Sequence, residues 1–241
     1  MSIDGIGYDA VEYVSSKQLP FRVDVERFTL FSLADDVTGM KVLDAGCGDG
    51  IYSRELIDRG AAHVIGVDGD ERFVSLAREK SRGYNGKLEF HHNLIQHFHG
   101  IEDRELILGS YIMSYPKTLD DAVRYCRAIA SHLSEGGRFV GFNNNPFDVF
   151  DGKRFARYGC EKEMHGGKEG ERVIWRVKGL SDPIVNYHLK PETYEKAFAE
   201  AGFSDFHWVK VMLDPKSEQE AGYWDEFFEK EPPFISMSAV R

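Results

Sequence analysis

The chain has 241 residues, of which 42% are hydrophobic and 29% are charged, as in an ordinary globular protein. This length is enough for one large α/β domain with its own core. The formal net charge of −10 argues against a general nucleic-acid binder, because neutralising phosphates requires clustered Lys and Arg. We therefore expect no nucleic-acid partner.

The cysteines and the N-terminus indicate where the protein works. Cys47, Cys126 and Cys160 lie far apart and form no CxxC pair, which disfavours a zinc site and a disulfide framework. The N-terminus has neither the basic start nor the apolar core of a signal peptide. No apolar run approaches the roughly 18 residues of a membrane span. We expect a cytoplasmic protein with no membrane partner.

The first part of the chain changes from helices to alternating strands and helices. Residues 1–39 have helical patterning that breaks at Pro20. Beyond them, apolar strands alternate with helices that Gly60 and Gly83 end. This alternation predicts parallel strands joined by right-handed crossovers in a doubly wound sheet. The expected strands are 41–45, 62–68, 87–92, 105–113 and 138–143.

The alternation stops at residues 144–190, which we interpret as a β-rich insertion holding two strands, "ERVIWRVKG" and "PIVNYHLK". Residues 191–241 then add a helix and two strands, and the last of these is expected to be antiparallel and to lie at the sheet edge. The chain is thus predicted to be one domain. Its parts are an N-terminal helical lid (1–39), a core (40–143), the insertion on the substrate side, and a segment that completes the sheet.

The stretch "DAGCGDG" forms the turn after the first strand, where doubly wound sheets bind their ligands. Its glycines, Gly46, Gly48 and Gly50, give G-x-G-x-G. The dinucleotide fingerprint G-x-G-x-x-G requires its third glycine where this chain has Ile51, which disfavours a nicotinamide or flavin cofactor. No Lys-Ser/Thr pair follows, so the loop is not a P-loop.

Asp68 ends the next strand and should lie level with this loop. Its two carboxylate oxygens can accept hydrogen bonds from both hydroxyls of a ribose. A helix N-cap is the usual alternative for such an acid, but Asp70 serves as the cap of the following helix. We therefore expect Asp68 to have no structural role.

These motifs together resemble a known family. "VLDAGCGDG", "VIGVDGD" and "LSEGGRFV" look like the motifs of class I S-adenosylmethionine-dependent methyltransferases, and the resemblance covers residues 40–143. "KPETYEKAFAEAGF" and the final strands extend it, since this family has a seven-stranded sheet with an antiparallel last strand. More narrowly, "KQLPFRVDVERFTL", "YIMSY" and "NNNP" are similar to small-molecule methyltransferases of the toxoflavin-synthase type.

The resemblance implies S-adenosylmethionine as cofactor and S-adenosylhomocysteine as product. The loop would hold the methionine half and Asp68 the ribose. After the third strand relatives often carry Gly-Asp-Ala, whose Asp accepts a hydrogen bond from adenine, whereas this chain has "HHNLIQ". The amide oxygen of Asn93 could replace that contact. The implied cofactor residues are Asp44, Gly46, Cys47, Gly48, Asp68, Gly69, Asn93, Leu94 and Ser110.

Methyl transfer is a direct displacement, so the protein mainly aligns the acceptor and excludes water. We expect a small aromatic or heterocyclic acceptor, methylated on N or O without a strong general base, and the sequence does not identify a catalytic residue. The Asn/Asp-Pro-Pro-Tyr signature of nucleic-acid amino methyltransferases is missing. Candidate acceptor contacts are Tyr8, Tyr13, Tyr111, Tyr115, Asn143, Asn145 and His188.

Several alternatives stay open. Asn143, Asn144 and Asn145 can form a polar turn or contact a heterocycle. Tyr8, Tyr13, Lys17 and Arg22 can form a lid or be exposed helix residues. "HHNLIQHFH" has four histidines, but strand alternation separates the first two, so we expect no metal. A cofactor-binding protein without transferase activity and a nucleotide-dependent oxidoreductase are the rival functions.

Overall fold

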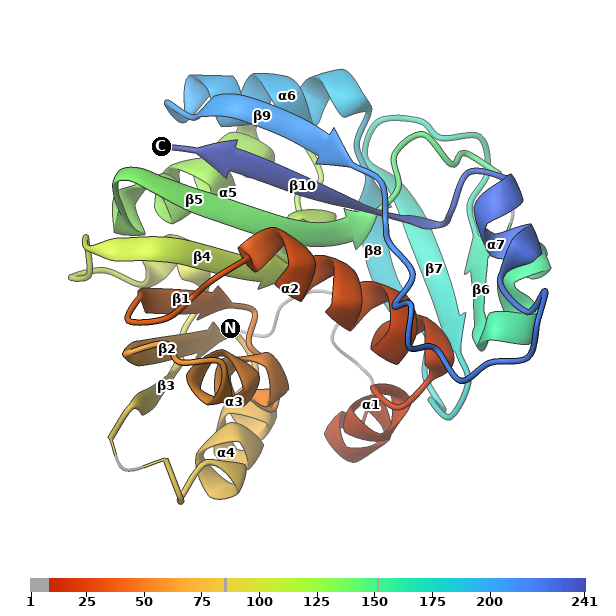
Figure 1. Cartoon of the computed structure of the whole chain (residues 1–241). Helices are drawn as coiled ribbons and strands as arrows, with labels where there is room; N and C mark the ends of the chain where they lie inside the picture. Colours follow the sequence, from red (N-terminus) through yellow and green to blue (C-terminus); the bar gives the residue numbers. More distant parts are fainter. Residues whose placement is uncertain (1–8, 85, 151) are drawn as a thin grey trace.

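The computed structural model describes residues 9–84, 86–150 and 152–241. Seven strands form the main sheet in the order β3-β2-β1-β4-β5-β10-β9 (Figure 1). Neighbouring strands from β3 to β5 pair in parallel, as the alternating pattern predicts. Their bounds are β1 Lys41–Ala45, β2 His63–Asp68, β3 Leu88–His92, β4 Arg104–Ser110, β5 Leu133–Asn144, β9 Ser204–Val209 and β10 Phe234–Val240.

The last strand is antiparallel, as predicted, but its position corrects the prediction. β10 pairs antiparallel with both β5 and β9, so it lies between them and β9 forms the edge. Burial explains this choice, because Phe234, Ile235, Met237 and Ala239 of β10 are buried whereas β9 has no fully buried residue. The more apolar strand occupies the inner position.

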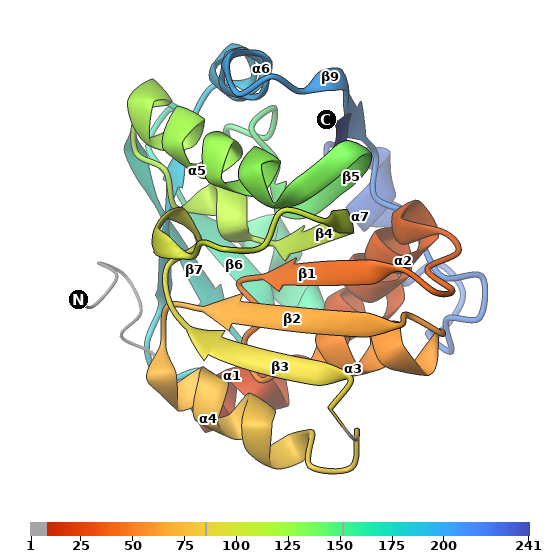
Figure 2. The same cartoon turned by 90° about the vertical axis from the view of Figure 1, so that its left-hand side faces the viewer.

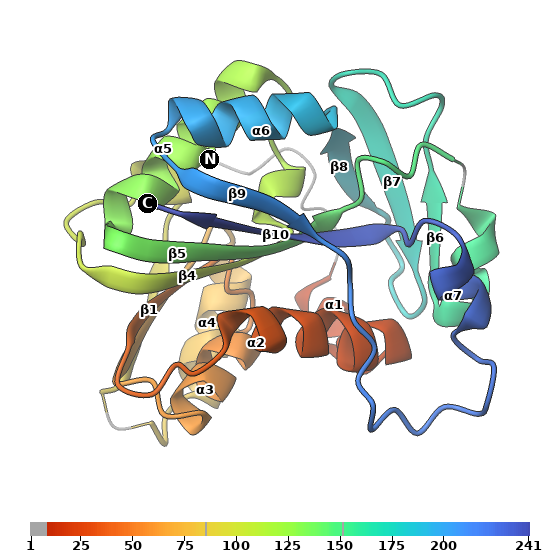
Figure 3. The same cartoon turned by 45° about the horizontal axis from the view of Figure 1, so that its top comes forward.

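Helices cover both faces of the main sheet (Figure 3). The helices α2 (Phe28–Ala34), α3 (Ile51–Asp58) and α4 (Glu71–Lys80) lie on one side, and α5 (Leu119–His132) and α6 (Pro191–Glu200) lie on the other. Each side has its own apolar core. Figure 2 shows β1, β2 and β3 side by side, with α3 and α4 below them.

The N-terminal segment contains α1 (Ala10–Ser16) and the π-helical turn η1 (Phe21–Arg27), which runs directly into α2. The break at Pro20 is confirmed, since Pro20 is the residue before η1. The predicted strand 105–113 is shorter than expected. It ends with β4 at Ser110, and η3 (Ile112–Ser114) follows. The short turn η2 (Ile95–His97) follows β3.

The insertion forms a separate antiparallel sheet in the order β6-β7-β8. The two predicted strands are β7 (Glu171–Val177) and β8 (Ile184–His188), and the sequence prediction missed β6 (Cys160–Glu163). The small sheet, the turn η4 (Lys153–Tyr158) and the helix α7 (Asp225–Glu229) lie beyond the carboxyl ends of β4 and β5 (Figure 1). The insertion therefore stands at the end of the sheet where ligands bind.

Candidate active site

The glycine loop follows β1 and is held against β2 through its backbone. The amides of Gly46 and Cys47 donate to the carbonyl of Val67 at 2.8 and 3.1 Å. Gly46 and Gly48 have φ of +75° and +54°, a left-handed conformation that favours glycine. A Cβ on Gly48 would have no atom within 4 Å, so this side of the loop faces open space. The loop thus has room for a ligand against its backbone.

Asp68 has a structural role that the sequence analysis did not expect. Its Oδ2 accepts from the amide of Gly48 at 2.8 Å, and its Oδ1 accepts from the amide of Asp70 at 2.9 Å. Burial raises the pKa of Asp68 to about 6, against the lowering effect of these hydrogen bonds. Each oxygen still has a lone pair for a ligand hydroxyl. Asp70 caps α4 as predicted, accepting from the amide of Arg72.

We call the hollow above this loop the glycine-loop cavity. It encloses about 840 Å³, including the space open to solvent at its mouth. Eight of the nine predicted cofactor residues line it, and only Asp44 does not. Those eight are Gly46, Cys47, Gly48, Asp68, Gly69, Asn93, Leu94 and Ser110.

Asp44 lies beneath the loop instead. It is buried, and its Oδ2 accepts from Ser53 Oγ of α3 at 2.5 Å. Burial raises the pKa of Asp44 to about 6, while the Ser53 hydroxyl opposes that rise. In this position Asp44 joins the end of β1 to α3 and so fixes the loop between them.

Asn93 follows β3 at the far side of the glycine-loop cavity. Its Nδ2 donates to the carbonyl of His97 at 3.3 Å. The amide oxygen is then the atom left to accept a hydrogen bond, as adenine recognition would require. Leu94 and Ile95 lie beside it and give this end of the cavity an apolar wall.

Glu26 of η1 is fully buried between five polar side chains, and the sequence analysis missed it. Its Oε1 accepts from Lys17 Nζ at 2.8 Å, from Tyr52 at 2.7 Å and from Ser110 at 3.0 Å. Its Oε2 accepts from Arg22 Nη1 at 3.2 Å and from Tyr111 at 3.1 Å. Burial alone would raise the pKa of Glu26, but Lys17 and Arg22 lower it to about 2. The carboxylate therefore stays charged and ties the N-terminal segment to β4.

A second hollow, which we call the aromatic cavity, lies between η1, β4, β5 and the insertion. Its volume is about 380 Å³, including open space. Three polar residues also line it, namely Arg22, Asn144 and Asn186. Its rings are those of Tyr13, Phe21, Tyr111, Tyr115, Trp175 and Phe234. Phe234 stacks on Trp175 and on Phe21, with ring centres 5.0 and 5.3 Å apart.

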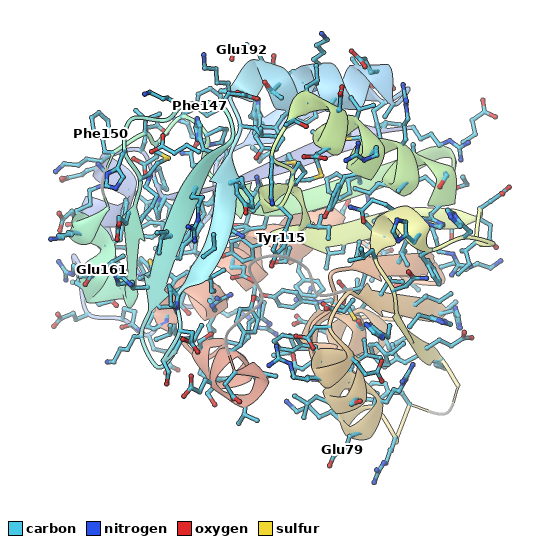
Figure 4. All side chains as sticks on the ribbon, turned by 180° about the vertical axis from the view of Figure 1, so that it is seen from behind. Glu79, Tyr115, Phe147, Phe150, Glu161 and Glu192 are labelled. Atoms are coloured by element: carbon cyan, nitrogen blue, oxygen red, sulfur yellow. The ribbon has the colours of Figure 1, made fainter. Side chains whose placement is uncertain are left out.

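The two cavities are neighbours. Tyr13, Tyr111 and Tyr115 line both of them. Tyr111 has φ of +63°, which is uncommon for a residue with a side chain and often occurs at functional sites. Seen from behind, Figure 4 shows Tyr115 where the insertion and the main sheet meet. A ligand in one cavity would therefore be close to a ligand in the other.

Three other predicted acceptor residues, Asn143, Asn145 and His188, line neither cavity. Asn143 is buried and contacts Ser114 and Tyr194. Asn145 donates to the carbonyl of Pro232 at 2.8 Å, and it lines a smaller hollow together with His188. Tyr8 lies outside the described residues. The third amide, Asn144, is the one that reaches the aromatic cavity.

Three further observations concern buried charge, metal ligands and membranes. Arg22 is buried rather than exposed, as is most of Lys17, so both belong to the site and not to a solvated helix face. Among the described residues, no cluster of His, Cys, Asp and Glu could hold a metal ion. In the same part of the chain, no helix is long and apolar enough to cross a membrane.

Comparisons with known proteins agree with this geometry. Residues 42–137 match the family described as "Methyltransferase domain". The chain is 28% identical over 204 residues to a carboxy-S-adenosyl-L-methionine synthase of Wolinella succinogenes, covering 80% of this chain and 83% of that protein. It is 25% identical to an N-demethylindolmycin N-methyltransferase of Streptomyces griseus, covering 75% and 76%.

Solved structures show the same fold. An S-adenosylmethionine-dependent methyltransferase from Mesorhizobium loti has a TM-score of 0.67 at 21% identity, covering 94% of this chain and 100% of that one. The similarity to the toxoflavin-synthase branch stays a prediction. Residues 42–137 thus match the methyltransferase domain and the main sheet has the class I strand order, so the chain is an S-adenosylmethionine-dependent methyltransferase whose cofactor is S-adenosylmethionine.

Proposed function

We propose that the enzyme methylates a nitrogen or oxygen of a small aromatic or heterocyclic molecule bound in the aromatic cavity. One observation carries this proposal: Tyr13, Tyr111 and Tyr115 line both the aromatic cavity and the glycine-loop cavity. Stacked rings line it, and flat rings are the ligands that such walls bind best. A relative named N-demethylindolmycin N-methyltransferase supports an acceptor of this kind.

The proposed cofactor contacts follow the lining of the glycine-loop cavity. Gly46, Cys47 and Gly48 would lie along the methionine half, and Asp68 would accept hydrogen bonds from the ribose hydroxyls. Asn93 and Leu94 would contact adenine. Asp44 would act indirectly, by positioning the loop through Ser53.

The bound cofactor supplies a methyl group on a positively charged sulfur. The bound cofactor would supply this methyl group to a lone pair on the acceptor nitrogen or oxygen, and its sulfur would keep the electron pair of the carbon–sulfur bond. The acceptor's proton leaves to water. The protein's part is to bind the acceptor at the shared tyrosines, orient its lone pair and exclude solvent.

Filling the aromatic cavity tests the proposal. Ile184 of β8 lines this cavity, whereas Val185 beside it does not and lies on the opposite face of the strand. We expect Ile184→Phe to abolish transfer of labelled methyl to phenols, amines and heterocycles that the parent methylates, with binding of S-adenosylhomocysteine retained. Val185→Phe should methylate them as the parent does.

Two results would contradict the proposal. One is a parent enzyme that binds S-adenosylhomocysteine but labels no small molecule in the screen, which is the behaviour of a silent cofactor-binding protein. The other is undiminished methylation by Ile184→Phe, which would place the acceptor elsewhere.

A further inference from the structure

Arg22 is the charged residue among those lining the aromatic cavity, and its side chain is only 3% exposed. The carbon of its guanidinium lies 5.0 Å from the ring centre of Tyr13 and 5.7 Å from that of Tyr111. Burial would favour the neutral form, but Tyr13 and the Glu26 carboxylate raise the pKa of Arg22 above its ordinary value. The wall of the cavity therefore holds a permanent, largely dehydrated cation.

This cation is only partly compensated. Glu26 is shared between Arg22 and Lys17, so one carboxylate serves two cations. The other groups bonded to Glu26 are the hydroxyls of Tyr52, Ser110 and Tyr111. Asp44 acts on Lys17, but from beneath the glycine loop. An unbalanced positive charge is thus left beside the aromatic cavity, where an anion would relieve the cost of burying it.

Three residues lining the same cavity have buried polar atoms without a hydrogen-bond partner in the described part of the chain. They are Arg22 Nε and Trp175 Nε1, both donors, and Asn144 Oδ1, an acceptor. The Nδ2 of Asn144 donates to Asn186 Oδ1 at 3.2 Å, which leaves the oxygen as its unused atom. Leaving a buried polar group unpaired costs about 1–3 kcal/mol, so such atoms gathered at one cavity point to a ligand.

We propose that the methyl acceptor is an aromatic or heteroaromatic acid, held by pairing of its carboxylate with the unused Nε face of Arg22. The ring lies among the aromatic walls. An acceptor atom of the ring accepts a hydrogen bond from Trp175 Nε1, and an N–H or O–H of the ring donates to Asn144 Oδ1. This proposal rests on the proposed function and narrows it to one chemical class of acceptor.

Acid and amide pairs test the carboxylate without changing the ring. The probes are anthranilate with anthranilamide, 4-hydroxybenzoate with 4-hydroxybenzamide, and indole-2-carboxylate with indole-2-carboxamide. Each is titrated calorimetrically into the protein saturated with S-adenosylhomocysteine. Hydrogen bonds to charged groups contribute about 1.5–3 kcal/mol, so we expect at least one acid to bind about tenfold to 100-fold more tightly than its amide.

Variants then assign the preference to Arg22. Arg22→Lys keeps the charge but removes Nε, so it should reduce the preference for the acid. Arg22→Met removes both the charge and Nε, so it should reduce this preference to about twofold or less. Trp175→Phe, which keeps an aromatic ring but removes the indole N–H, should weaken acid and amide alike. Arg154→Lys is the matched control, because Arg154 Nε is also buried and unpartnered but the residue lines neither cavity. It should bind every probe as the parent does.

Folding is checked in each variant by thermal unfolding and by its affinity for S-adenosylhomocysteine. Three results would overturn the proposal. The parent could bind acids and amides equally, or bind no acid at millimolar concentration. Alternatively, folded Arg22→Lys and Arg22→Met could keep the parent's preference for the acid. Methylation of neutral phenols or amines in preference to acids would also overturn the proposal, while leaving the proposed function standing. A parent that binds acids through Arg22 but labels nothing would overturn the proposed function and with it the acid's role as methyl acceptor, while the acid-binding site itself would stand.

Discussion

The two cavities of this enzyme are built in different ways from the same chain. The glycine-loop cavity takes much of its lining from short segments at the ends of consecutive strands, such as 46–49, 67–69 and 93–96. The aromatic cavity takes its lining from segments far apart in sequence, from Tyr13 through Trp175 to Phe234. A doubly wound sheet fixes the first kind of site through local turns, whereas the second kind depends on how added segments pack on it.

Glu26 joins the two. Its Oε1 bonds Lys17, Tyr52 and Ser110, which line the glycine-loop cavity, while its Oε2 bonds Arg22 of the aromatic cavity and Tyr111, which lines both. One carboxylate thus supports both cavities. Removing it should therefore disturb both cavities at once, although they are built differently.

We expect Glu26→Gln to have the largest effect. It leaves two buried cations without their anion, and removing one partner of a buried ion pair costs about 3–5 kcal/mol. The free energy of unfolding, measured by chemical denaturation, should fall by about that amount. Binding of S-adenosylhomocysteine should weaken, because Lys17, Tyr52 and Ser110 beside the glycine loop lose the carboxylate that they share.

A second glutamate, whose cationic partners are more exposed, provides the control for Glu26. Glu55 also pairs with two cations, Arg27 and Arg59, but both arginines are nearly half exposed. Glu55→Gln should therefore cost about 1 kcal/mol or less. Adding Lys17→Met to Glu26→Gln should recover part of the lost stability, because it removes one unpaired cation. Equal losses for the Glu26 and Glu55 variants would contradict the role given to Glu26.

The contrast between the cavities also separates what the sequence could predict from what it could not. Gly46, Gly48 and Asp68 belong to turns whose geometry depends on a few adjacent residues, so their place at the strand ends follows from the sequence. The glycines of the loop also indicate space for a ligand beside its backbone, because a residue without a side chain lets a ligand approach closely.

Glu26 could not be found in this way, and for Arg22 the sequence left a lid residue and an exposed helix residue as open alternatives. Charged residues in a helix are ordinarily exposed, and their burial becomes visible only when Tyr52, Ser110 and Tyr111 are placed around them. The position of β10 was missed for a related reason. The inner position in the sheet goes to the strand that buries more apolar residues. Whether β10 or β9 takes it can be judged only when the burial of both strands is known.

Asp68→Ala should have the next largest effect, and it should affect one cavity only. Losing hydrogen bonds from a carboxylate to two ribose hydroxyls predicts affinity for S-adenosylhomocysteine lower by about 100-fold or more, measured by calorimetry. NAD(H), titrated in parallel, should not bind the parent. Asp70→Ala is the control, because it removes a helix cap and a half-exposed ion pair with Arg72, at about 1 kcal/mol of stability, and should leave the affinity unchanged.

The pH dependence of binding gives Asp68 an independent test. With its pKa raised to about 6, Asp68 takes up a proton as pH falls through that value and then loses part of its capacity to accept. Affinity of the parent should therefore fall below about pH 6, and Asp68→Asn should show less of this fall. Asp68→Ala binding as tightly as the parent would refute the ribose contact.

Asn93 should have the smallest effect, because a single neutral hydrogen bond contributes about 0.5–1.5 kcal/mol. We expect Asn93→Ala to bind S-adenosylhomocysteine about threefold to tenfold more weakly than the parent. S-inosylhomocysteine, in which a carbonyl oxygen replaces the adenine amino group, lacks the amino donor that would face the Asn93 oxygen, so the parent should prefer S-adenosylhomocysteine by the same factor. Asn93→Ala should lose this preference, whereas Asn93→Asp should enlarge it, because a carboxylate is the stronger acceptor. If Asn93→Ala still prefers adenine over hypoxanthine as the parent does, adenine is recognised by another group. The residues after β3 would then contribute only the apolar wall of Leu94 and Ile95.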